Sequence, residues 1–393
     1  MRRVKRRLAL LTEIIAPYRI PVFNALAARD DIDLHVIFLS ENDPGLRQWP
    51  VYKKEIRFSY EVLPAWRRRV GKYNLLVNRG VGAALRRFRP SAVLCGGYNY
   101  LASWRAAWWA KSNNVPALLW SESTVNDHRR GRREVEFMKV RFTRLCKAFV
   151  AAGKASRDYM IAMGVPPERV FVAPNAVDVE FYAAIARSAR QDAAAIRAHH
   201  GLPSRYFLCT GRLVPEKGIF DLLAAYAKLE AVERSQIGLV FAGDGASRSQ
   251  LEERGAAINP GCVRFCGFVH REELAELYAL ADALVFPSHS DPWGLVVNEA
   301  MACGLPIIAS EIAGCVPDLV ENAENGFVVP SGNVEELARA MRTLLSNPSL
   351  AREMGASSAL RIQAFTPEAC ADGFSRAVAF ACADPRMGTE LEP

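Results

Sequence analysis

Short apolar runs alternate with longer segments in which apolar residues recur every three or four positions. Short apolar runs are typical of buried strands, and the longer period is typical of amphipathic helices. The first half predicts strands at residues 8–15, 34–39, 92–95, 117–120, 148–151 and 170–173, and helices at 21–28, 77–88, 102–111, 135–145 and 154–163. This alternation predicts a parallel sheet with helices on both faces.

The second half of the chain repeats the alternation. It predicts strands at residues 206–209, 238–242, 263–266, 283–286 and 306–309, and helices at 219–230, 247–255, 272–279, 295–303 and 335–345. The turn-rich sequence APNAVD, residues 173–178, marks a domain boundary. We therefore expect an α/β protein with two doubly wound Rossmann-like domains, residues 1–175 and 176–365, facing each other across a ligand-binding cleft.

Charge divides the chain at the same place. Residues 1–175 hold 32 Lys and Arg against 14 Asp and Glu, whereas residues 176–393 hold 18 against 28. A basic half of this kind is typical of a protein that meets an anionic membrane surface, or of one whose cations are simply solvated, and both interpretations stay open. Base-stacking aromatic residues at regular spacing do not accompany the basic clusters, which argues against nucleic acid.

Composition indicates a cytoplasmic protein. There is no apolar run long enough for a membrane-spanning helix, and nine scattered cysteines without zinc-ligand spacing indicate reduced core thiols. The basic N-terminus resembles a signal peptide, but Thr12 and Glu13 interrupt its apolar segment. We interpret this segment as the first strand, with a targeting segment as the alternative. Asp31 and Asp33 resemble a metal motif of another fold but precede a first-domain strand, so we assign them to the surface.

Two cations stand at the end of a predicted strand in TGRLVPEKG, residues 210–218. Gly211 permits close backbone approach, while Arg212 and Lys217 lie beside a predicted helix N-terminus. A guanidinium binds phosphate through two parallel hydrogen bonds, an ammonium adds charge, and helix-end N–H groups complete a diphosphate site. The alternative is an ordinary strand-to-helix turn with two surface cations.

Two further turns follow predicted strands. Gly243 and Gly245 begin a dinucleotide-like pattern, but Arg248 stands where the third glycine belongs, which disfavours an NAD-linked enzyme. This remains a tight turn suited to a position beside a ligand. At the end of another strand, the main chain near Val269 is placed to meet a nucleobase and Phe268 to pack on it, with a plain turn as the alternative.

Two carboxylates frame a predicted helix. Asp291 lies in the loop before it, and Glu299 lies about five residues into it, about 7.5 Å along the axis. This separation resembles that between the sugar and ribose ends of a nucleotide sugar whose diphosphate lies at the helix N-terminus. A carboxylate accepts two hydrogen bonds at once, so each acid suits a vicinal diol. The alternatives are helix capping for Asp291 and a paired or exposed helix position for Glu299.

Together these motifs resemble the retaining glycosyltransferases of the GT-B fold, glycosyltransferase family 4. The resemblance covers nearly the whole chain, and it rests on the order and spacing of several short motifs: PYRIPVFNAL at 17–26, PNAVD at 174–178, GRL at 211–213, EKG at 216–218, GDG at 243–245, GFV at 267–269 and SHSDPWGLVVNEAMACGLP at 288–306. Each motif alone is weak, whereas the set is specific.

The resemblance implies roles for individual residues. Arg212 and Lys217 would hold the donor diphosphate and stabilise the leaving phosphate as charge develops, and Asp291 would contact the transferred sugar. Glu299 would bind the ribose hydroxyls. The full donor-binding set implied by position is Gly211, Gly243, Gly245, Phe268, Val269, Gly294, Leu295 and Glu299.

The chain departs from the family pattern at three places. Asp291 stands where the family has Glu, one methylene longer, which bears on donor choice or activity. The sequence APYR at residues 16–19 replaces a glycine pair, and Ser121 and Glu122 replace a histidine for which His128 is one substitute. Sugar or acceptor contacts are expected from Tyr18, Arg19, Glu122, His128 and Asn175.

These observations predict a retaining glycosyltransferase that uses a nucleoside diphosphate sugar and needs neither metal nor cofactor. The basic first domain would hold a lipid-linked or polysaccharide acceptor of cell-surface glycan synthesis, at the inner face of the cytoplasmic membrane. Residues 366–393 would contain a tail helix that crosses back to the first domain. The rivals are a nucleotide-sugar epimerase, which would need further carboxylate and histidine groups, and a non-catalytic nucleotide-sugar-binding protein, which the change at Asp291 favours.

Overall fold

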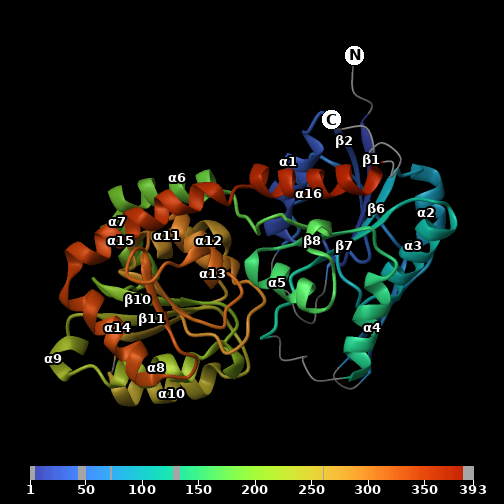
Figure 1. Ribbon diagram of the computed structural model, residues 1–393. Coiled ribbons are helices and arrows are strands. Elements are labelled where there is room, and N and C mark those ends of the chain that lie inside the picture. Colours follow the sequence, from blue (N-terminus) through green and yellow to red (C-terminus); the bar gives the residue numbers. More distant parts are fainter. Residues whose placement is uncertain (1–4, 43–49, 71–72, 127–132, 260, 384–393) are drawn as a thin grey trace, which may run out of the picture. The chain divides into compact units, whose positions relative to one another are not determined.

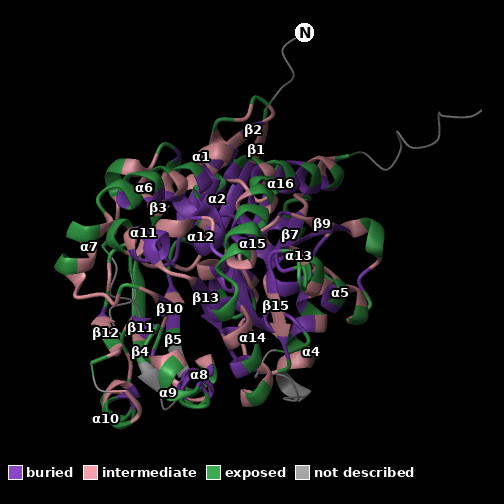
Figure 2. Cartoon of the chain, turned by 90° about the vertical axis from the view of Figure 1, so that its left-hand side faces the viewer, coloured by how far each residue is buried: buried purple, intermediate pink, exposed green. Residues whose placement is uncertain are grey.

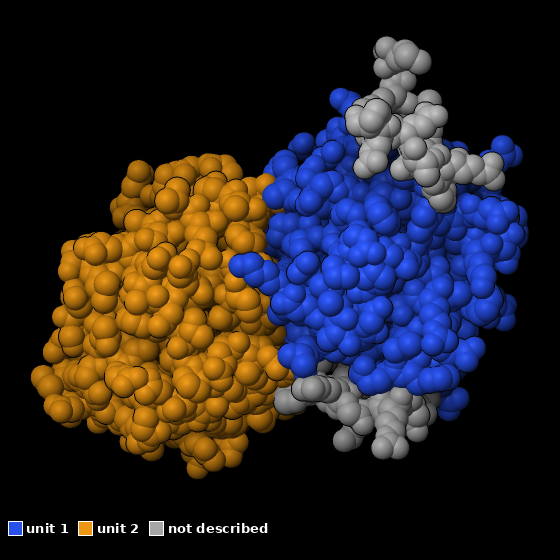
Figure 3. All heavy atoms as spheres, in the orientation of Figure 1, with its two compact units in different colours: residues 1–125, 129–176, 367–393 blue, residues 126–128, 177–366 orange. Residues whose placement is uncertain are grey.

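The computed structural model describes residues 5–42, 50–70, 73–126, 133–259 and 261–383. The chain forms two compact units, drawn in different colours in Figure 3. Unit 1 comprises residues 1–125, 129–176 and 367–393, and unit 2 comprises residues 126–128 and 177–366. The last segment of the chain therefore belongs to the same unit as the first.

Unit 1 is built on a seven-stranded parallel sheet of order β3-β2-β1-β6-β7-β8-β9. Figure 1 labels β1, β2, β6, β7 and β8 of this sheet. The apolar runs become strands because helices bury them on both faces, which is the usual setting of parallel strands (Figure 2). The bounds are β1 Arg6–Thr12, β2 Ile32–Phe38, β3 Ser59–Val62, β6 Ala92–Cys95, β7 Ala117–Ser121, β8 Ala148–Ala151 and β9 Val170–Val172.

Helices cover the two faces of this sheet and separate two cores. One core lies under α1 (Ile20–Ala27) and α16 (Pro367–Cys382), and the other lies under α2 (Val81–Phe88), α3 (Leu101–Ser112), α4 (Arg133–Thr143) and α5 (Lys154–Ala162). The tail helix α16 packs on α1, β8 and β9, and its Phe374 meets Trp120 edge to face at 5.1 Å between ring centroids. The expected return of the tail to the first domain is thus confirmed.

The acidic pair before the second strand has a structural role. Asp31 accepts a hydrogen bond from Arg29 at 2.9 Å and another from Ser375 of α16, while Asp33 pairs with Arg7 of β1 at 3.2 Å. Both residues lie at the surface with partly exposed carboxylates, as expected, and each has a basic partner. They fasten the N-terminal strand and the tail helix to the sheet.

Unit 2 repeats the architecture with a six-stranded parallel sheet of order β12-β11-β10-β13-β14-β15. Its strands are β10 Tyr206–Thr210, β11 Gly238–Ala242, β12 Val263–Gly267, β13 Ala283–Phe286, β14 Ile307–Ser310 and β15 Gly326–Val329. Its helices are α6 Val179–Gln191, α7 Ala193–His200, α8 Ile219–Ala227, α9 Ala231–Arg234, α10 Arg248–Ile258, α11 Arg271–Leu280, α12 Leu295–Ala302, α13 Val316–Leu319, α14 Val334–Ser346 and α15 Pro348–Arg361.

The expected fold class is confirmed, with local corrections. The predicted helix at 77–88 began too early, because Asn78 still belongs to β5 (Tyr73–Asn78) and α2 begins only after Gly80, whose φ is 88°. The expectations missed β3, the hairpin of β4 (Ala65–Val70) and β5, strand β15, and helices α6, α7, α9, α13 and α15. The strand β4 reads AWRRRV and therefore lacks the apolar run by which buried strands are recognised.

Among the described helices, none has the length and apolarity needed to cross a bilayer. All nine cysteines are free thiols, and six of them are buried.

Candidate functional site

The predicted glycine turns lie together at the carboxyl ends of the unit 2 strands. The N–H of Gly211 donates to the carbonyl oxygen of Ala242 at 3.0 Å, and the N–H of Gly243 donates to that of Gly267 at 2.7 Å. A Cβ at Gly243 would lie 1.9 Å from the Gly211 carbonyl oxygen. Only glycine lets these turns pack backbone against backbone, so main-chain groups of β10, β11 and β12 form one edge.

The two predicted cations at this edge differ in their surroundings. Arg212 is exposed, and its guanidinium makes no hydrogen bond or ion pair with any residue in the described part of the chain. Lys217 ends the 3₁₀ turn Pro215–Lys217 and is half-buried against Phe286, with its Nζ 6.0 Å from the ring centroid. The guanidinium is therefore available to a ligand, whereas the ammonium already has a partner.

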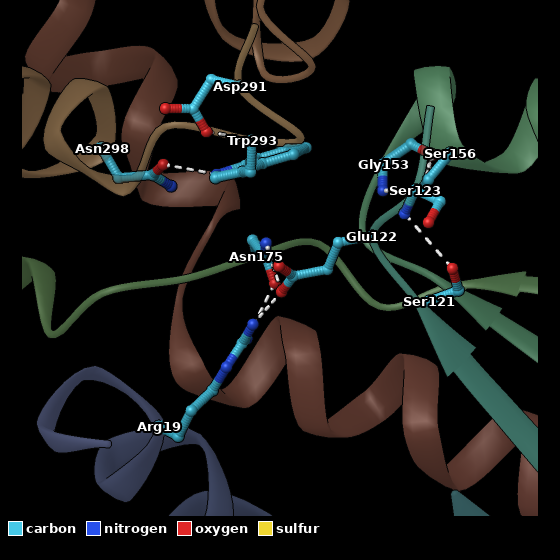
Figure 4. A network of polar contacts seen from close by, with 10 residues as sticks. All are labelled: Arg19, Ser121, Glu122, Ser123, Gly153, Ser156, Asn175, Asp291, Trp293 and Asn298. Carbon is cyan, nitrogen blue, oxygen red and sulfur yellow. Dashed lines mark hydrogen bonds and ion pairs between the residues drawn. The ribbon is translucent and has the colours of Figure 1, made fainter. Parts of the chain in front are cut away.

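That partner is Asp291. Its Oδ2 pairs with Lys217 Nζ, and its Oδ1 accepts the main-chain N–H of Trp293 at 3.2 Å (Figure 4). The side chain thus fixes its own loop two residues ahead, as Asp does in turns. It does not cap α12, because Gly294, with φ 98°, holds the N-cap position. The structure joins two residues that the resemblance assigns to different parts of the donor.

The loop is held further by its tryptophan. Trp293 is buried, and its Nε1–H donates to Asn298 Oδ1 of α12 at 2.8 Å (Figure 4). Since α12 begins at Leu295, directly after Gly294, this bond couples the Asp291 loop to the first turns of the helix. The helix ends at Ala302, one residue before the predicted end at 303, and Gly304 with φ 77° follows it.

Glu299 projects from the fifth residue of α12 into a tyrosine pair. Tyr278 of α11 donates its O–H to Glu299 Oε2 at 2.9 Å, and Tyr182 of α6 is a second hydrogen-bond partner. Burial raises the pKa of Glu299 to about 7, and the two phenol hydrogen bonds offset part of that rise. Tyr278 also meets Thr210 Oγ1 at 3.0 Å, which ties the acid to the end of β10.

The end of β12 presents an aromatic side chain. Phe268 is exposed and meets His270 edge to face at 5.3 Å between centroids, while Val269 is half-buried. An exposed phenyl ring at a strand end is suited to packing on a planar ligand.

Unit 1 has its own polar cluster at the carboxyl end of β7. The guanidinium of Arg19 donates to Asn175 Oδ1 at 2.8 Å and pairs with Glu122, while Asn175 Nδ2 donates to Glu122 Oε1 at 3.0 Å (Figure 4). Arg19 is only 9% exposed, and its Cζ stands 4.2 Å from the Trp120 ring centroid. Burial lowers the pKa of Arg19.

Of the five residues expected to contact sugar or acceptor, the structure therefore brings three together: Arg19, Glu122 and Asn175. Tyr18 is half-buried beside Arg19, whose Cζ lies 5.2 Å from its ring centroid. His128 lies outside the described residues.

The sequence pattern did not reveal which residues contact the predicted site residues of unit 2. The pattern of α11 predicted a helix but gave no reason to place Tyr278 against an acid, and α6, which supplies Tyr182, was not predicted. His289 was also missed, although it stands two residues before Asp291. It pairs with Asp221 at 2.9 Å and with Ser331 Oγ at 3.2 Å, so it fastens the Asp291 loop to α8 and to the turn after β15.

Two family models match the chain side by side. Residues 192–361 match glycosyl transferases group 1, and residues 23–181 match glycosyltransferase family 4. The first match contains every predicted residue of the unit 2 edge, and the second contains Glu122 and Asn175.

Individual proteins support the same relationship. The chain is 32% identical over 264 residues to D-inositol 3-phosphate glycosyltransferase of Kineococcus radiotolerans, covering 60% of each chain. It is 34% identical over 213 residues to the enzyme of that name from Streptomyces bingchenggensis, covering 51% of this chain and 46% of that one. The chain thus spans about half to three fifths of the length of these curated relatives.

Among solved structures, HepE of Anabaena in complex with UDP aligns with a TM-score of 0.75 at 19% identity, covering 95% of this chain and 99% of that one. The same protein has also been solved with UDP-glucose. At this identity the likeness establishes the shared fold.

Proposed function

The chain belongs to the group 1 glycosyltransferases of glycosyltransferase family 4, and on that premise we propose that it transfers a sugar from a nucleoside diphosphate sugar with retention of configuration. The observation that carries the proposal is Arg212, an exposed guanidinium beside three strand ends and without a partner in the described chain. A guanidinium in this state is ready to bind a diphosphate with two hydrogen bonds.

In the proposed reaction, the bond between the anomeric carbon and the diphosphate breaks, and a bond to the acceptor oxygen forms on the same face of the sugar. The proton of the acceptor hydroxyl passes to the leaving diphosphate. Arg212 and Lys217 stabilise the charge that develops on the leaving diphosphate. Lys217 changes partners for this purpose, because in the free protein it pairs with Asp291. Asp291 then turns toward the transferred sugar. Retention itself rests on the resemblance to family 4.

Glu299 completes the donor site at the ribose end. Its Oε2 already accepts a phenol O–H from Tyr278, and a carboxylate has further acceptor positions for two ribose hydroxyls. Phe268 and the main chain at Val269 meet the base. The donor is a substrate, and the proposed chemistry uses no metal or cofactor.

We further propose a lipid-linked or polysaccharide acceptor of cell-surface glycan synthesis, reached from the cytoplasmic face of an anionic membrane. The support is charge: residues 1–175 carry an excess of 18 basic side chains. Anionic lipid surfaces attract such an excess over about a Debye length.

Replacement of Arg212 by Ala tests the proposed function. UDP-glucose is the first donor to assay, because HepE has been solved with it. We expect a loss of about 100-fold to 1000-fold in kcat for donor turnover, since a charge-stabilising donor is removed at the reacting group. The thermal midpoint should stay within about 1 °C of wild type, because an exposed side chain contributes little to stability.

Arg352→Ala is the matched control, since Arg352 is an exposed arginine of α15 in the same unit. Equal turnover by the Arg212 and Arg352 variants would overturn the assignment of Arg212.

A non-catalytic nucleotide-sugar-binding protein is the competing function, and the Lys217–Asp291 pair favours it because it occupies the ammonium. Donor turnover by wild type and by Asp291→Glu separates the two. Binding of donor without turnover in either protein establishes the competing function.

A further inference from the structure

A long stretch of unit 1 carries no acidic residue. Residues 62–121 contain ten Lys and Arg and neither Asp nor Glu. The ten positive charges of this stretch exceed the formal net charge of the whole chain, which is +8. Much of the excess positive charge of the protein therefore lies in one continuous segment. The segment forms the hairpin β4–β5, the helices α2 and α3, and the strands β6 and β7.

The hairpin has one face turned outward. Strands β4 and β5 are antiparallel, with Trp66 opposite Val77 and Arg68 opposite Leu75. Side chains alternate along a strand, and Leu76 and Asn78 are buried, so these cross-strand pairs share the outer face. Trp66 is 53% exposed and Leu75 is 47% exposed, and Arg68 is exposed between them. A tryptophan, a leucine and a cation therefore share a face that is open to solvent.

Helix α3 continues this surface. Leu101, Arg105, Trp108 and Lys111 fall at helical spacing on its exposed side, and Leu101 and Trp108 are 47% and 51% exposed. Lys111 Nζ stands 5.6 Å from the Trp108 ring centroid.

Packing joins the hairpin and the helix into one surface. Helix α3 lies beside α2 (Figure 1) and also packs on β5. Helix α2 adds the exposed cations Arg86 and Arg87. Arg105 of α3 donates to the main-chain oxygen of Asn78, at the end of β5, at 2.9 Å. The exposed face of the helix therefore begins where the hairpin ends.

We propose that this hairpin–helix surface seats the protein on a bilayer rich in anionic lipid. Its cations lie at headgroup level, and Trp66, Trp108, Leu75 and Leu101 enter the boundary between headgroups and acyl chains. Interfacial elements combine these two residue classes because apolar burial and attraction to anionic lipid add. The inference deepens the proposed function, which it assumes, by giving a lipid-linked acceptor a surface through which the protein reaches it.

The apolar residues select a bilayer over another polyanion. Nucleic acid or an acidic glycan would use the same arginines, and tryptophan stacks on bases. Leu75 and Leu101 are aliphatic, however, and an aliphatic side chain at nearly half exposure gains nothing from a phosphate backbone. Both leucines gain free energy when their apolar area is buried, and the acyl chains of a bilayer offer that burial whereas a polyanion does not.

Vesicle sedimentation tests the proposal on the full-length chain. Wild type should sediment with vesicles of equal parts phosphatidylcholine and phosphatidylglycerol and stay in solution with phosphatidylcholine alone. Trp66→Ser with Trp108→Ser should lower the partition coefficient about tenfold, since two apolar anchors are lost. Arg68→Ser with Lys111→Ser should lower it about thirtyfold at low salt and much less at high salt.

The matched control is Arg352→Ser with Leu360→Ser, which removes one exposed cation and one exposed leucine from α15 of unit 2. It should bind vesicles like wild type, and all three double variants should keep the wild-type thermal midpoint. Tryptophan variants that bind like wild type overturn the proposal, as does release of wild type by polyuridylate with no dependence on the tryptophans. Donor turnover without vesicles should be unchanged in every variant, and its absence in wild type would refute the proposed function alone.

Discussion

The two strand edges of this molecule use the same residue types in opposite ways. In unit 1, Arg19 is buried and bonded to Glu122 and Asn175, so every partner is supplied by the protein. In unit 2, Arg212 is exposed and has no partner among the described residues. We call an arginine saturated when protein groups bind its guanidinium, and available when they do not. A saturated arginine holds its neighbours in place, whereas an available one can bind a ligand. The sequence alone does not separate the two, because both follow an apolar run.

The glutamates at the two edges, Glu122 and Glu299, also differ in their partners. Glu122 meets a guanidinium, while Glu299 meets the phenols of Tyr278 and Tyr182. The first carboxylate is compensated by charge and the second only by hydrogen bonds. The cost of burying a carboxylate without a cation appears as the raised pKa of Glu299, about 7.

The largest expected effect comes from removal of the saturated arginine. Arg19→Ala should lower the free energy of unfolding by about 3–5 kcal/mol, because it leaves the half-buried carboxylate of Glu122 without its cation. Urea denaturation measures this loss. Arg212→Ala is the natural control, since the same substitution at the other edge should cost less than about 0.5 kcal/mol. Equal losses at the two positions would remove the distinction between saturated and available arginine.

A somewhat smaller effect, with a dependence on pH, is expected at Glu299. Its folded pKa of about 7 lies above the ordinary glutamate value of 4.5, so the folded state binds the proton more tightly than the unfolded state. Stability therefore falls as pH rises from about 4.5 through 7, and the full cost is present above 7. A shift of this size corresponds to about 3 kcal/mol.

Glu299→Gln removes the ionisation and should stabilise the protein by up to that amount at pH 8, with no electrostatic gain at pH 4. Thermal melts of wild type and variant at both pH values measure the difference. Glu253→Gln, on the exposed side of α10, serves as a control that should show no such dependence. A constant difference between Glu299→Gln and wild type at the two pH values would contradict the raised pKa.

These residues show how much of the fold and of the candidate site the sequence could predict. Apolar runs fixed most of the buried strands, because a parallel strand covered on both faces leaves a continuous apolar signature. The β4–β5 hairpin lacks that signature since one of its faces is open, and α7 buries none of its side chains, so both were missed. Motif spacing brought Arg212, Lys217, Asp291 and Glu299 to one unit. It did not reveal that Lys217 pairs with Asp291, or that two tyrosines surround Glu299, because these partners come from distant segments.

The smallest expected effect tests the Lys217–Asp291 pair, which the sequence did not reveal. Asp291→Asn should tighten the binding of UDP, which lacks the transferred sugar, by up to about fivefold. A half-buried ion pair is worth up to about 1 kcal/mol, and the substitution frees Lys217 Nζ while it removes a negative charge near the proposed diphosphate position. Calorimetric titration with UDP measures the change. Glu353→Gln, which removes one exposed carboxylate from α15, should leave UDP affinity unchanged. Weaker binding of UDP by Asp291→Asn would contradict this expectation. It would mean that the Asp291 carboxylate holds Lys217 Nζ in the position from which it binds the diphosphate.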